Sequence, residues 1–296
     1  MYAVYCLLLG VIQGAAEFLP ISSSGHLALF QDFFGGALSR VGSITAFSVL
    51  LHLGTLLAVL IFYRKDLIHL IAAAKTLTQK LFSSKSLRSL KDLTGEERML
   101  LFVCIGTLPL VALKIFDLLL AHFSGFSLLD SMEKHITMQP IAVGVILIFN
   151  GWMLFYSDRL QHDTRAFSGK NALAVGLFQL FAVLPGLSRS GSTITGGRMN
   201  GLKRSEAVRF SFLLSIPAVL GSLVTEAPKL FSDRTLSSSD WLLFLAATAL
   251  ACLVGLLSMH HLNLIAQKST FKKFSYYCFA VGALAVAAGI LKLAVG

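Results

Sequence analysis

Six apolar segments, each of about 20 residues, constrain this chain more than any other feature of its sequence. They cover 43–64, 99–120, 137–157, 205–226, 241–260 and 275–295. A segment of this length and composition can cross the hydrocarbon core of a bilayer as an α-helix. Because backbone polar groups inside a bilayer must be hydrogen-bonded within the protein, helices are expected and open sheet edges are not. We therefore expect 1–296 to form a single all-α polytopic membrane domain.

The composition agrees with this expectation and indicates a partner. Hydrophobic residues make up 55% of the chain, charged residues 14%, and the mean hydropathy is +0.76, outside the range of soluble globular domains. The net charge is +10. In a membrane protein such an excess belongs in cytoplasmic loops that face anionic lipid headgroups. We therefore expect the lipid bilayer, and not nucleic acid, as the partner.

Two further apolar stretches, 3–36 and 171–204, are interrupted by polar turns. The turns contain Pro20 to His26 in the first stretch and Pro185 to Thr195 in the second. Non-helical backbone at membrane depth is tolerated only where protein or a water-filled cavity covers it. Each stretch therefore predicts a re-entrant helix-loop-helix hairpin.

The chain reads as two similar halves, 1–157 and 171–296, each with one hairpin and three membrane spans. At an offset of 166, six residues of the first hairpin match six of the second. The matched pairs are Gly10 and Gly176, Gln13 and Gln179, Ala16 and Ala182, Ser22 and Ser188, Ser24 and Ser190, and Gly25 and Gly191. Since an odd number of spans separates the hairpins, the sequence predicts an inverted-topology repeat whose hairpin tips meet near the midplane.

The distribution of lysine and arginine predicts the orientation. One group of loops holds 17 of these residues and the other group holds 4. The first group is 64–98, 158–170, 198–204 and 261–274, and the second is 37–42, 121–136 and 227–240. By the positive-inside rule the first group is cytoplasmic. Both termini and the first hairpin then lie on the outer side, and the second hairpin enters from the cytoplasm.

Arg189 lies at the centre of the second polar turn. An arginine near the bilayer midplane costs roughly 2.5–3.5 kcal/mol on insertion scales, so it needs an acidic partner or water. Hydroxyls and glycines surround it: Ser188, Ser190, Ser192, Thr193, Gly186 and Gly191. These residues suit a phosphoryl group, because arginine is a planar bidentate donor, the hydroxyls are short O–H donors, and the glycines let the backbone approach closely. The alternative is a connecting loop whose arginine extends to the interface.

In the first hairpin, Gln13 and Glu17 are four residues apart and share a helix face that leads into Ser22 to His26. If the hairpins meet, Glu17 and His26 come within reach of Arg189. These are groups that phosphoryl transfer needs, because Arg189 can hold the charged oxygens, His26 or a serine can attack or activate water, and Glu17 can orient the base. Glu17 can also hold a divalent cation that bridges a diphosphate. The alternative is a purely structural Glu17–Arg189 ion pair.

These two motifs resemble those of a known family. Gln13-x-x-x-Glu17-Phe-Leu-Pro-Ile-Ser-Ser-Ser-Gly-His26 and Pro185-Gly-Leu-Ser-Arg-Ser-Gly-Ser-Thr193 are similar to the signatures of the bacterial undecaprenyl-diphosphate phosphatases, also called bacitracin-resistance proteins. The resemblance extends over the whole chain. It implies an enzyme of the bacterial inner membrane that hydrolyses undecaprenyl diphosphate to undecaprenyl phosphate and inorganic phosphate. Such an enzyme recycles the lipid carrier for peptidoglycan synthesis and confers bacitracin resistance, with an active site that we expect to face the periplasm.

The resemblance also implies roles for individual residues. It assigns catalysis to Glu17, Arg189 and His26, with Ser23 alongside His26. Whether His26 or Ser23 is the attacking group stays open. For phosphate binding the resemblance implies Ser188, Arg189 and Thr193, and the polar turns themselves add Ser190, Gly186, Gly191 and Ser22. The family is described as dependent on a divalent cation, Mg²⁺ or Ca²⁺. In this chain Glu17 and Gln13 are the expected ligands. Family members often have glutamate where this chain has Gln13. The expected substrate is a polyprenyl diphosphate lipid, and a homodimer is a possibility.

A secondary transporter or flippase for a phosphorylated polyprenyl lipid is the competing hypothesis. Inverted repeats with broken helices that meet at the midplane are typical of transporters. A flippase needs Arg189 and the hydroxyls to neutralise the headgroup, but it has no obvious use for His26 beside Glu17. The histidine therefore favours the phosphatase.

Overall fold

The computed structural model describes residues 2–34, 44–82, 93–160, 167–232, 237–268 and 270–295. Within these ranges the regular structure consists of helices, without strands, so the all-α prediction is confirmed. The helices are α1 (Tyr2–Phe18), α2 (Ser23–Phe34), α3 (Ile44–Phe62), α4 (Arg64–Phe82), α5 (Gly95–Ser124), α6 (Leu128–Thr137), α7 (Pro140–Arg159), α8 (Gly169–Phe181), α9 (Arg189–Met199), α10 (Arg204–Ser232), α11 (Ser238–Lys268) and α12 (Lys272–Val295).

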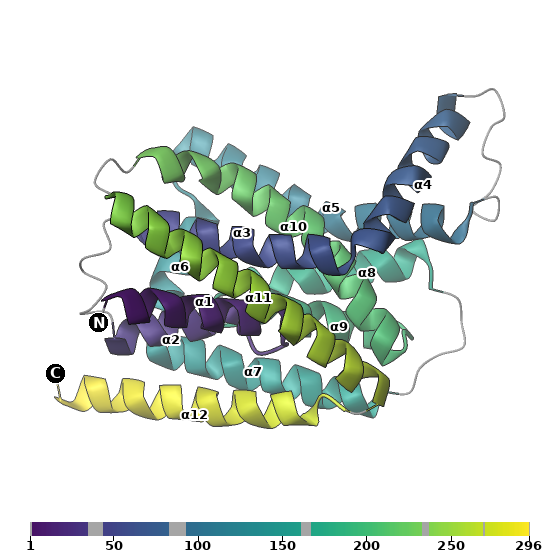
Figure 1. Cartoon of the computed structure of the whole chain (residues 1–296). Helices are drawn as coiled ribbons and strands as arrows, with labels where there is room; N and C mark the ends of the chain where they lie inside the picture. The colour runs from purple at the N-terminus through teal and green to yellow at the C-terminus, as the bar shows by residue number, and fades with distance from the viewer. Residues whose placement is uncertain are drawn as a thin grey trace.

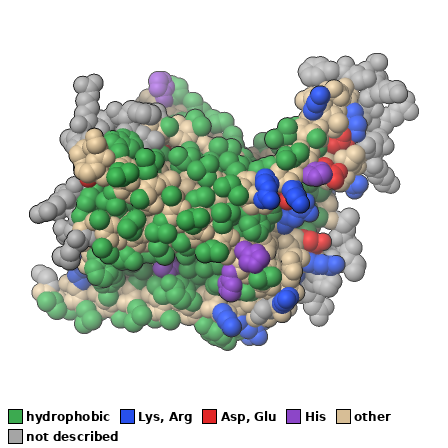
Figure 2. All heavy atoms as spheres, viewed as in Figure 1, with side chains coloured by type: hydrophobic (Ala, Val, Ile, Leu, Met, Phe, Trp, Pro, Cys, Tyr) green, Lys and Arg blue, Asp and Glu red, His purple; other side chains and the backbone are tan. Residues whose placement is uncertain are grey.

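The six predicted spans correspond to α3, α5, α7, α10, α11 and α12 (Figure 1). Five of them are long and apolar enough to cross a membrane on their own, and α3 makes a sixth if it is counted with α4 beyond a bend of 79°. Hydrophobic side chains cover much of the flank of the bundle that Figure 2 displays. The prediction of a polytopic membrane protein is confirmed.

Both interrupted stretches form hairpins of two short helices. The first is α1 and α2, which break between Phe18 and Ser23, and the second is α8 and α9, which break between Phe181 and Arg189. Figure 1 shows α1 and α2 at the end of the bundle where both termini lie, and α8 and α9 toward the opposite end. The hairpins therefore enter the bundle from opposite ends, as an inverted repeat requires.

Residues matched by the 166-residue offset make equivalent contacts. A Cβ atom on Gly10 of α1 would lie 2.6 Å from the carbonyl oxygen of Ala247 on α11. A Cβ atom on Gly176 of α8 would likewise collide with the carbonyl oxygen of Gly106 on α5. Glycine at both positions lets two helix backbones approach closely, as at small-residue contacts between membrane helices. The division into 1–157 and 171–296 stays a prediction, which this equivalence supports.

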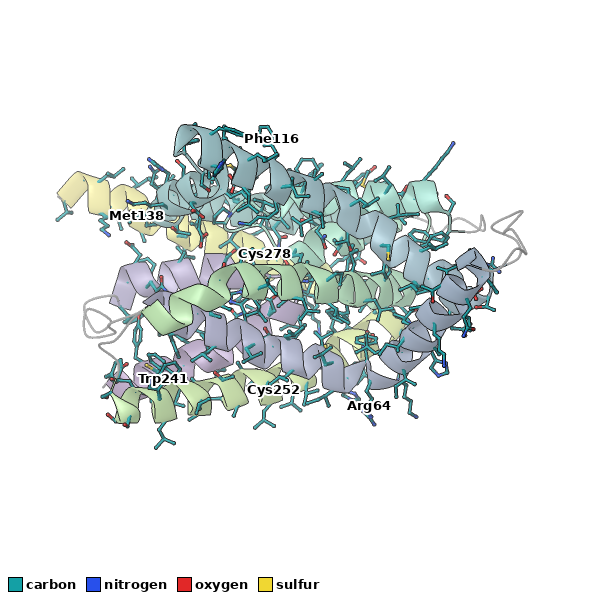
Figure 3. The ribbon with its side chains drawn as sticks, turned by 90° about the horizontal axis from the view of Figure 1, so that it is seen from above. Arg64, Phe116, Met138, Trp241, Cys252 and Cys278 are labelled. Carbon is teal, nitrogen blue, oxygen red and sulfur yellow. The ribbon has the colours of Figure 1, made fainter. Side chains whose placement is uncertain are left out.

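The basic stretch 64–98 begins with α4, which leaves the bundle at an angle. Lys80 of α4 pairs with Glu97 of α5 at 2.7 Å, and Thr76 donates to the same carboxylate. Lys and Arg side chains gather where α4 joins the bundle (Figure 2), and Arg64 marks that end in Figure 3, with Trp241 and Met138 toward the other end. Residues 83–92 of this stretch, the loop 37–42, and parts of the loops 158–170, 227–240 and 261–274 lie outside the described residues.

Helices α7 and α12 pack closely and support the hairpin tips. A Cβ atom on either Gly144 or Gly282 would lie 2.6 Å from the carbonyl oxygen of the other. Further along the same pair, a Cβ atom on Gly151 would lie 2.9 Å from the carbonyl oxygen of Ser275. This contact fixes the first turns of α12 against the middle of α7, and Cys278, labelled in Figure 3, lies between the two ends of the bundle.

Candidate active site

The two polar turns place the first residues of α2 and α9 at the hairpin tips. Ser22 has φ of 76°, a left-handed conformation that ends one helix and allows the next to begin, and its Oγ accepts a hydrogen bond from the Gly25 amide at 3.1 Å. Ser188 caps α9 in the same way, accepting from the Gly191 amide at 3.1 Å. Side-chain caps of this kind satisfy amides that a helix start leaves unpaired. The helix starts bring partial positive charge to the hairpin tips.

Glu17 at the end of α1 joins the two hairpins. Its Oε1 accepts from Arg189 Nη2 at 2.6 Å, and its Oε2 accepts from Ser23 Oγ at 2.7 Å and Gln13 Nε2 at 3.1 Å. The Glu17 side chain is 8% exposed and the Arg189 side chain 19%. A buried carboxylate needs such partners because its desolvation is costly. The structure thus brings together Gln13, Glu17, Ser23 and Arg189, and the predicted approach of Glu17 to Arg189 is observed.

Within the described part of the chain, two polar atoms next to this ion pair are buried without a hydrogen-bond partner. They are Arg189 Nη1, a donor, and Gln13 Oε1, an acceptor. Buried polar groups are nearly always paired in native proteins, so each such atom needs an explanation. A bound oxyanion would accept from Arg189 Nη1, since guanidinium groups favour phosphoryl and carboxylate oxygens.

Hydrogen bonds between the hairpins hold the tips together. The Gly186 amide donates to Ser24 Oγ at 3.1 Å, and Ser190 Oγ donates to the Leu19 carbonyl oxygen at 3.4 Å. Gly186 has φ of 96°, which favours glycine, and its Cα would lie 3.1 Å from a Cβ atom on Gly25. The glycines therefore permit the tips to touch.

Asn150 of α7 ties both turns to the bundle, and sequence analysis did not identify it. Its Nδ2 donates to the Pro20 carbonyl oxygen at 2.9 Å, and its Oδ1 accepts from the Ser188 amide at 3.3 Å. Asn150 is fully buried. An asparagine inside an apolar span was a signal for such a role, because polar side chains in membrane helices commonly bond to neighbouring helices.

Three residues expected to bind phosphate have partners inside the protein. The amides of Gly186 and Gly191 donate to Ser24 and Ser188, as described above. Thr193 lies within α9, where its hydroxyl donates to the Arg189 carbonyl oxygen and lies 2.6 Å from Ser211 Oγ. Their role in binding phosphate stays a prediction, and the described contacts give each a structural function.

Among the described residues His26 makes no hydrogen bond to Glu17, contrary to the expectation that the carboxylate orients the imidazole. Its Nδ1 lies 2.7 Å from the Ser22 carbonyl oxygen and its Nε2 lies 2.8 Å from the Tyr277 hydroxyl of α12. Ser23, the first residue of α2, takes the position on Glu17. His26 comes three residues later and faces α12, which accounts for the difference.

The residues can accommodate the expected cation only in part. Among the described residues, no group of three or more histidine, cysteine, aspartate or glutamate side chains could hold a metal ion. Glu17 supplies one carboxylate, and the unpartnered Gln13 Oε1 supplies one further oxygen. Mg²⁺ is often bound by one or two carboxylates together with substrate phosphate oxygens, so Gln13 and Glu17 fit a cation that arrives with a diphosphate.

Fold and site together define a polytopic membrane protein with a buried polar centre formed by two re-entrant hairpins, in which an arginine has a free donor for an anion. The family model described as bacitracin resistance protein BacA matches residues 6–284. The chain therefore belongs to the bacitracin resistance protein BacA family.

Curated relatives extend over almost the full chain. An undecaprenyl-diphosphatase of Desulforapulum autotrophicum is 34% identical over 285 residues, which cover 96% of this chain and 97% of the relative. Undecaprenyl-diphosphatases of Korarchaeum cryptofilum and Desulfosudis oleivorans are each 36% identical. The matches cover 95% and 98% of this chain, and 97% and 100% of the respective relatives.

Proposed function

We propose that this chain hydrolyses undecaprenyl diphosphate to undecaprenyl phosphate and inorganic phosphate. The observation that carries the proposal is the partly buried Arg189 guanidinium, which Glu17 holds through Nη2 while Nη1 has no partner among the described residues. Membership of the BacA family and the names of the relatives support the same substrate. The enzyme then returns a lipid carrier to cell-wall synthesis and lowers sensitivity to bacitracin.

Ser23 is the attacking group in the mechanism that this geometry favours. Its Oγ already donates to Glu17 Oε2 at 2.7 Å, so the carboxylate can take the proton as Oγ bonds to the terminal phosphorus. The bond between that phosphorus and the bridging oxygen breaks, and undecaprenyl phosphate leaves. Arg189 Nη1 donates to a phosphoryl oxygen throughout, and the helix starts at Ser23 and Arg189 favour its negative charge.

Water completes the reaction by attacking the phosphorylated Ser23. The water oxygen bonds to the phosphorus, the bond between the phosphorus and Ser23 Oγ breaks, and phosphate is released. Ser23 Oγ recovers its proton from Glu17, and the proton lost by water passes to His26. His26 can accept it at Nε2, because its Nδ1 lies on the Ser22 carbonyl oxygen and must carry the other ring proton. Attack by His26 itself is the alternative that sequence analysis left open.

A divalent cation is proposed to accompany the diphosphate at Gln13 and Glu17. When bound, it would neutralise charge on the diphosphate oxygens. Gln13 Oε1 is free to face it, whereas both Glu17 oxygens already accept hydrogen bonds in the described structure. The protein's own contribution is to hold Glu17 between Ser23 and Arg189.

The orientation belongs to the same proposal. With the basic end of the bundle in the cytoplasm, α1 and α2 enter from the outer side of a bacterial plasma membrane. The site at their tip would then be reached from the periplasm, where carrier lipid is released.

Phosphate release from purified protein in detergent tests the function. We expect inorganic phosphate and the monophosphate lipid in equal amounts from undecaprenyl diphosphate. Movement of the lipid between leaflets of a proteoliposome without phosphate release would favour the transporter instead.

A further inference from the structure

We infer that Tyr277 is the residue that positions His26 for proton transfer. The hydroxyl of Tyr277 lies 2.8 Å from His26 Nε2, across 251 residues of sequence. The two rings are nearly parallel, with an interplanar angle of 6° and centroids 5.5 Å apart. A hydrogen bond and a ring contact together fix both the direction and the plane of the imidazole. This inference rests on the proposed function, because it assigns His26 a role in hydrolysis.

The other ring nitrogen determines which tautomer is present. His26 Nδ1 lies 2.7 Å from the Ser22 carbonyl oxygen, which can only accept, so Nδ1 carries a proton. In the neutral imidazole Nε2 is then the acceptor, and the Tyr277 O–H donates to it. When Nε2 gains a proton, the same hydroxyl can rotate and accept from it. Tyr277 thus serves both protonation states without displacing the ring.

Tyr277 can perform this role because the backbone around it is fixed. Its neighbours Ser275 and Cys278 are fully buried. Gly151 of α7 lies directly against the Ser275 carbonyl oxygen, and Asn150 Nδ2 lies 3.4 Å from Cys278 Sγ. Asn150 also bonds to Pro20 in the first hairpin. Tyr277 is therefore held in register with the turn that carries His26.

Proton transfer to His26 requires the Tyr277 hydroxyl to change its hydrogen bond to Nε2. The Tyr277 O–H must therefore turn away from the Nε2 lone pair before Nε2 takes the proton of the attacking water. The side chain is 43% exposed although its neighbour Cys278 is buried. Tyr277 itself contacts no phosphoryl oxygen in this account, so it is a positioning residue.

The test compares Tyr277→Phe with Tyr276→Phe in the full-length protein. Tyr276 is the adjacent residue, is 59% exposed, and its ring lies 6.4 Å from that of Phe155. Losing one hydrogen bond to the imidazole should lower kcat for phosphate release about tenfold in Tyr277→Phe, with KM within about twofold of the parent. Tyr276→Phe should match the parent.

Nitrogen NMR of ¹⁵N-histidine-labelled protein supplies a reading independent of turnover. The His26 resonances are assigned from their absence in His26→Ala. We expect the Nε2 resonance to shift in Tyr277→Phe and to stay unchanged in Tyr276→Phe. Unchanged kcat and an unchanged Nε2 resonance in Tyr277→Phe would overturn the inference while leaving the phosphatase intact. A parent protein that releases no phosphate would instead remove the proposed function, and the NMR comparison would still report whether Tyr277 holds the ring.

Discussion

Glu17 and Arg189 are 172 residues apart in sequence, but Arg189 Nη2 donates to Glu17 Oε1 at 2.6 Å in the structure. Glu17 lies in the last turn of α1, the first helix of one hairpin. Arg189 begins α9, the second helix of the other hairpin. The ion pair therefore exists only when both hairpins are inserted and their tips touch. It connects the fold to the chemistry, because the same guanidinium that closes the hairpins keeps Nη1 free.

Replacement of Arg189 by lysine tests the free donor. Lysine keeps the charge but not the planar fork, so it cannot bond to Glu17 and a phosphoryl oxygen together in the same way. Since bonds to charged groups are worth about 1.5–3 kcal/mol, turnover should fall roughly tenfold to several hundredfold. Arg209→Lys, at an exposed arginine paired with Asp66, is the control and should retain parent activity. Equal turnover of both variants would remove Arg189 from phosphate binding.

Asn150→Ala tests how the turns are held. The substitution leaves the Pro20 carbonyl oxygen and the Ser188 amide without their partner in a buried place. Each unsatisfied group costs about 1–3 kcal/mol, so the thermal unfolding midpoint in detergent should drop and phosphate release should fall with it. Asn263→Ala, which removes an amide that donates to the Tyr63 hydroxyl at 3.4 Å, should have a smaller effect. A midpoint equal to that of the parent for Asn150→Ala would contradict this view of the turns.

Gly176→Ala and Gly221→Ala form a matched pair for helix packing. A Cβ atom at Gly176 collides with the Gly106 carbonyl oxygen, whereas a Cβ atom at Gly221 meets nothing within 4 Å. We expect Gly176→Ala to lose about 1–3 kcal/mol of stability through overpacking. Gly221→Ala should be neutral or more stable, since alanine favours helix over glycine by roughly 1 kcal/mol. Unfolding by heat in detergent compares the two, and equal midpoints would argue against the close α5–α8 contact.

Single cysteines test the orientation. Ser124→Cys at the end of α5 and Lys273→Cys at the start of α12 lie at opposite ends of the bundle, and both positions are exposed. An impermeant thiol reagent applied to intact cells should label the cysteine at position 124 and not the one at position 273, with the parent giving the background. The reverse pattern would invert the topology and place the first hairpin on the cytoplasmic side.

Much of the fold could be predicted because membrane spans depend on length and apolarity alone. The six spans, both hairpins and the meeting of Glu17 with Arg189 followed from the costs of leaving backbone or charge in lipid. The helix α6 was not predicted, because a segment of ten residues with many polar side chains is too short and too polar to be recognised as a membrane span.

The side-chain partners of the site could not be predicted in the same way. Which residue faces Glu17 depends on how α2 is rotated about its axis, and Ser23, not His26, occupies that place. Tyr277 and Asn150 were missed because their partners are far away in the sequence. Tyr277 contacts His26 of α2, and Asn150 bonds to both polar turns, and no local sequence pattern indicates such contacts.

Single-turnover phosphate release by Ser23→Ala tests whether Ser23 Oγ is the attacking atom, with Ser24→Ala as the control. Ser23 donates to Glu17, while the Ser24 hydroxyl accepts from the Gly186 amide of the other hairpin. If Ser23 Oγ attacks the terminal phosphorus, Ser23→Ala should release phosphate at least about a thousandfold more slowly than the parent, because removal of a nucleophile abolishes its pathway. Ser24→Ala should lose far less. Phosphate release by Ser23→Ala at close to the parent rate would contradict attack by Ser23 Oγ and leave His26 as the attacking group.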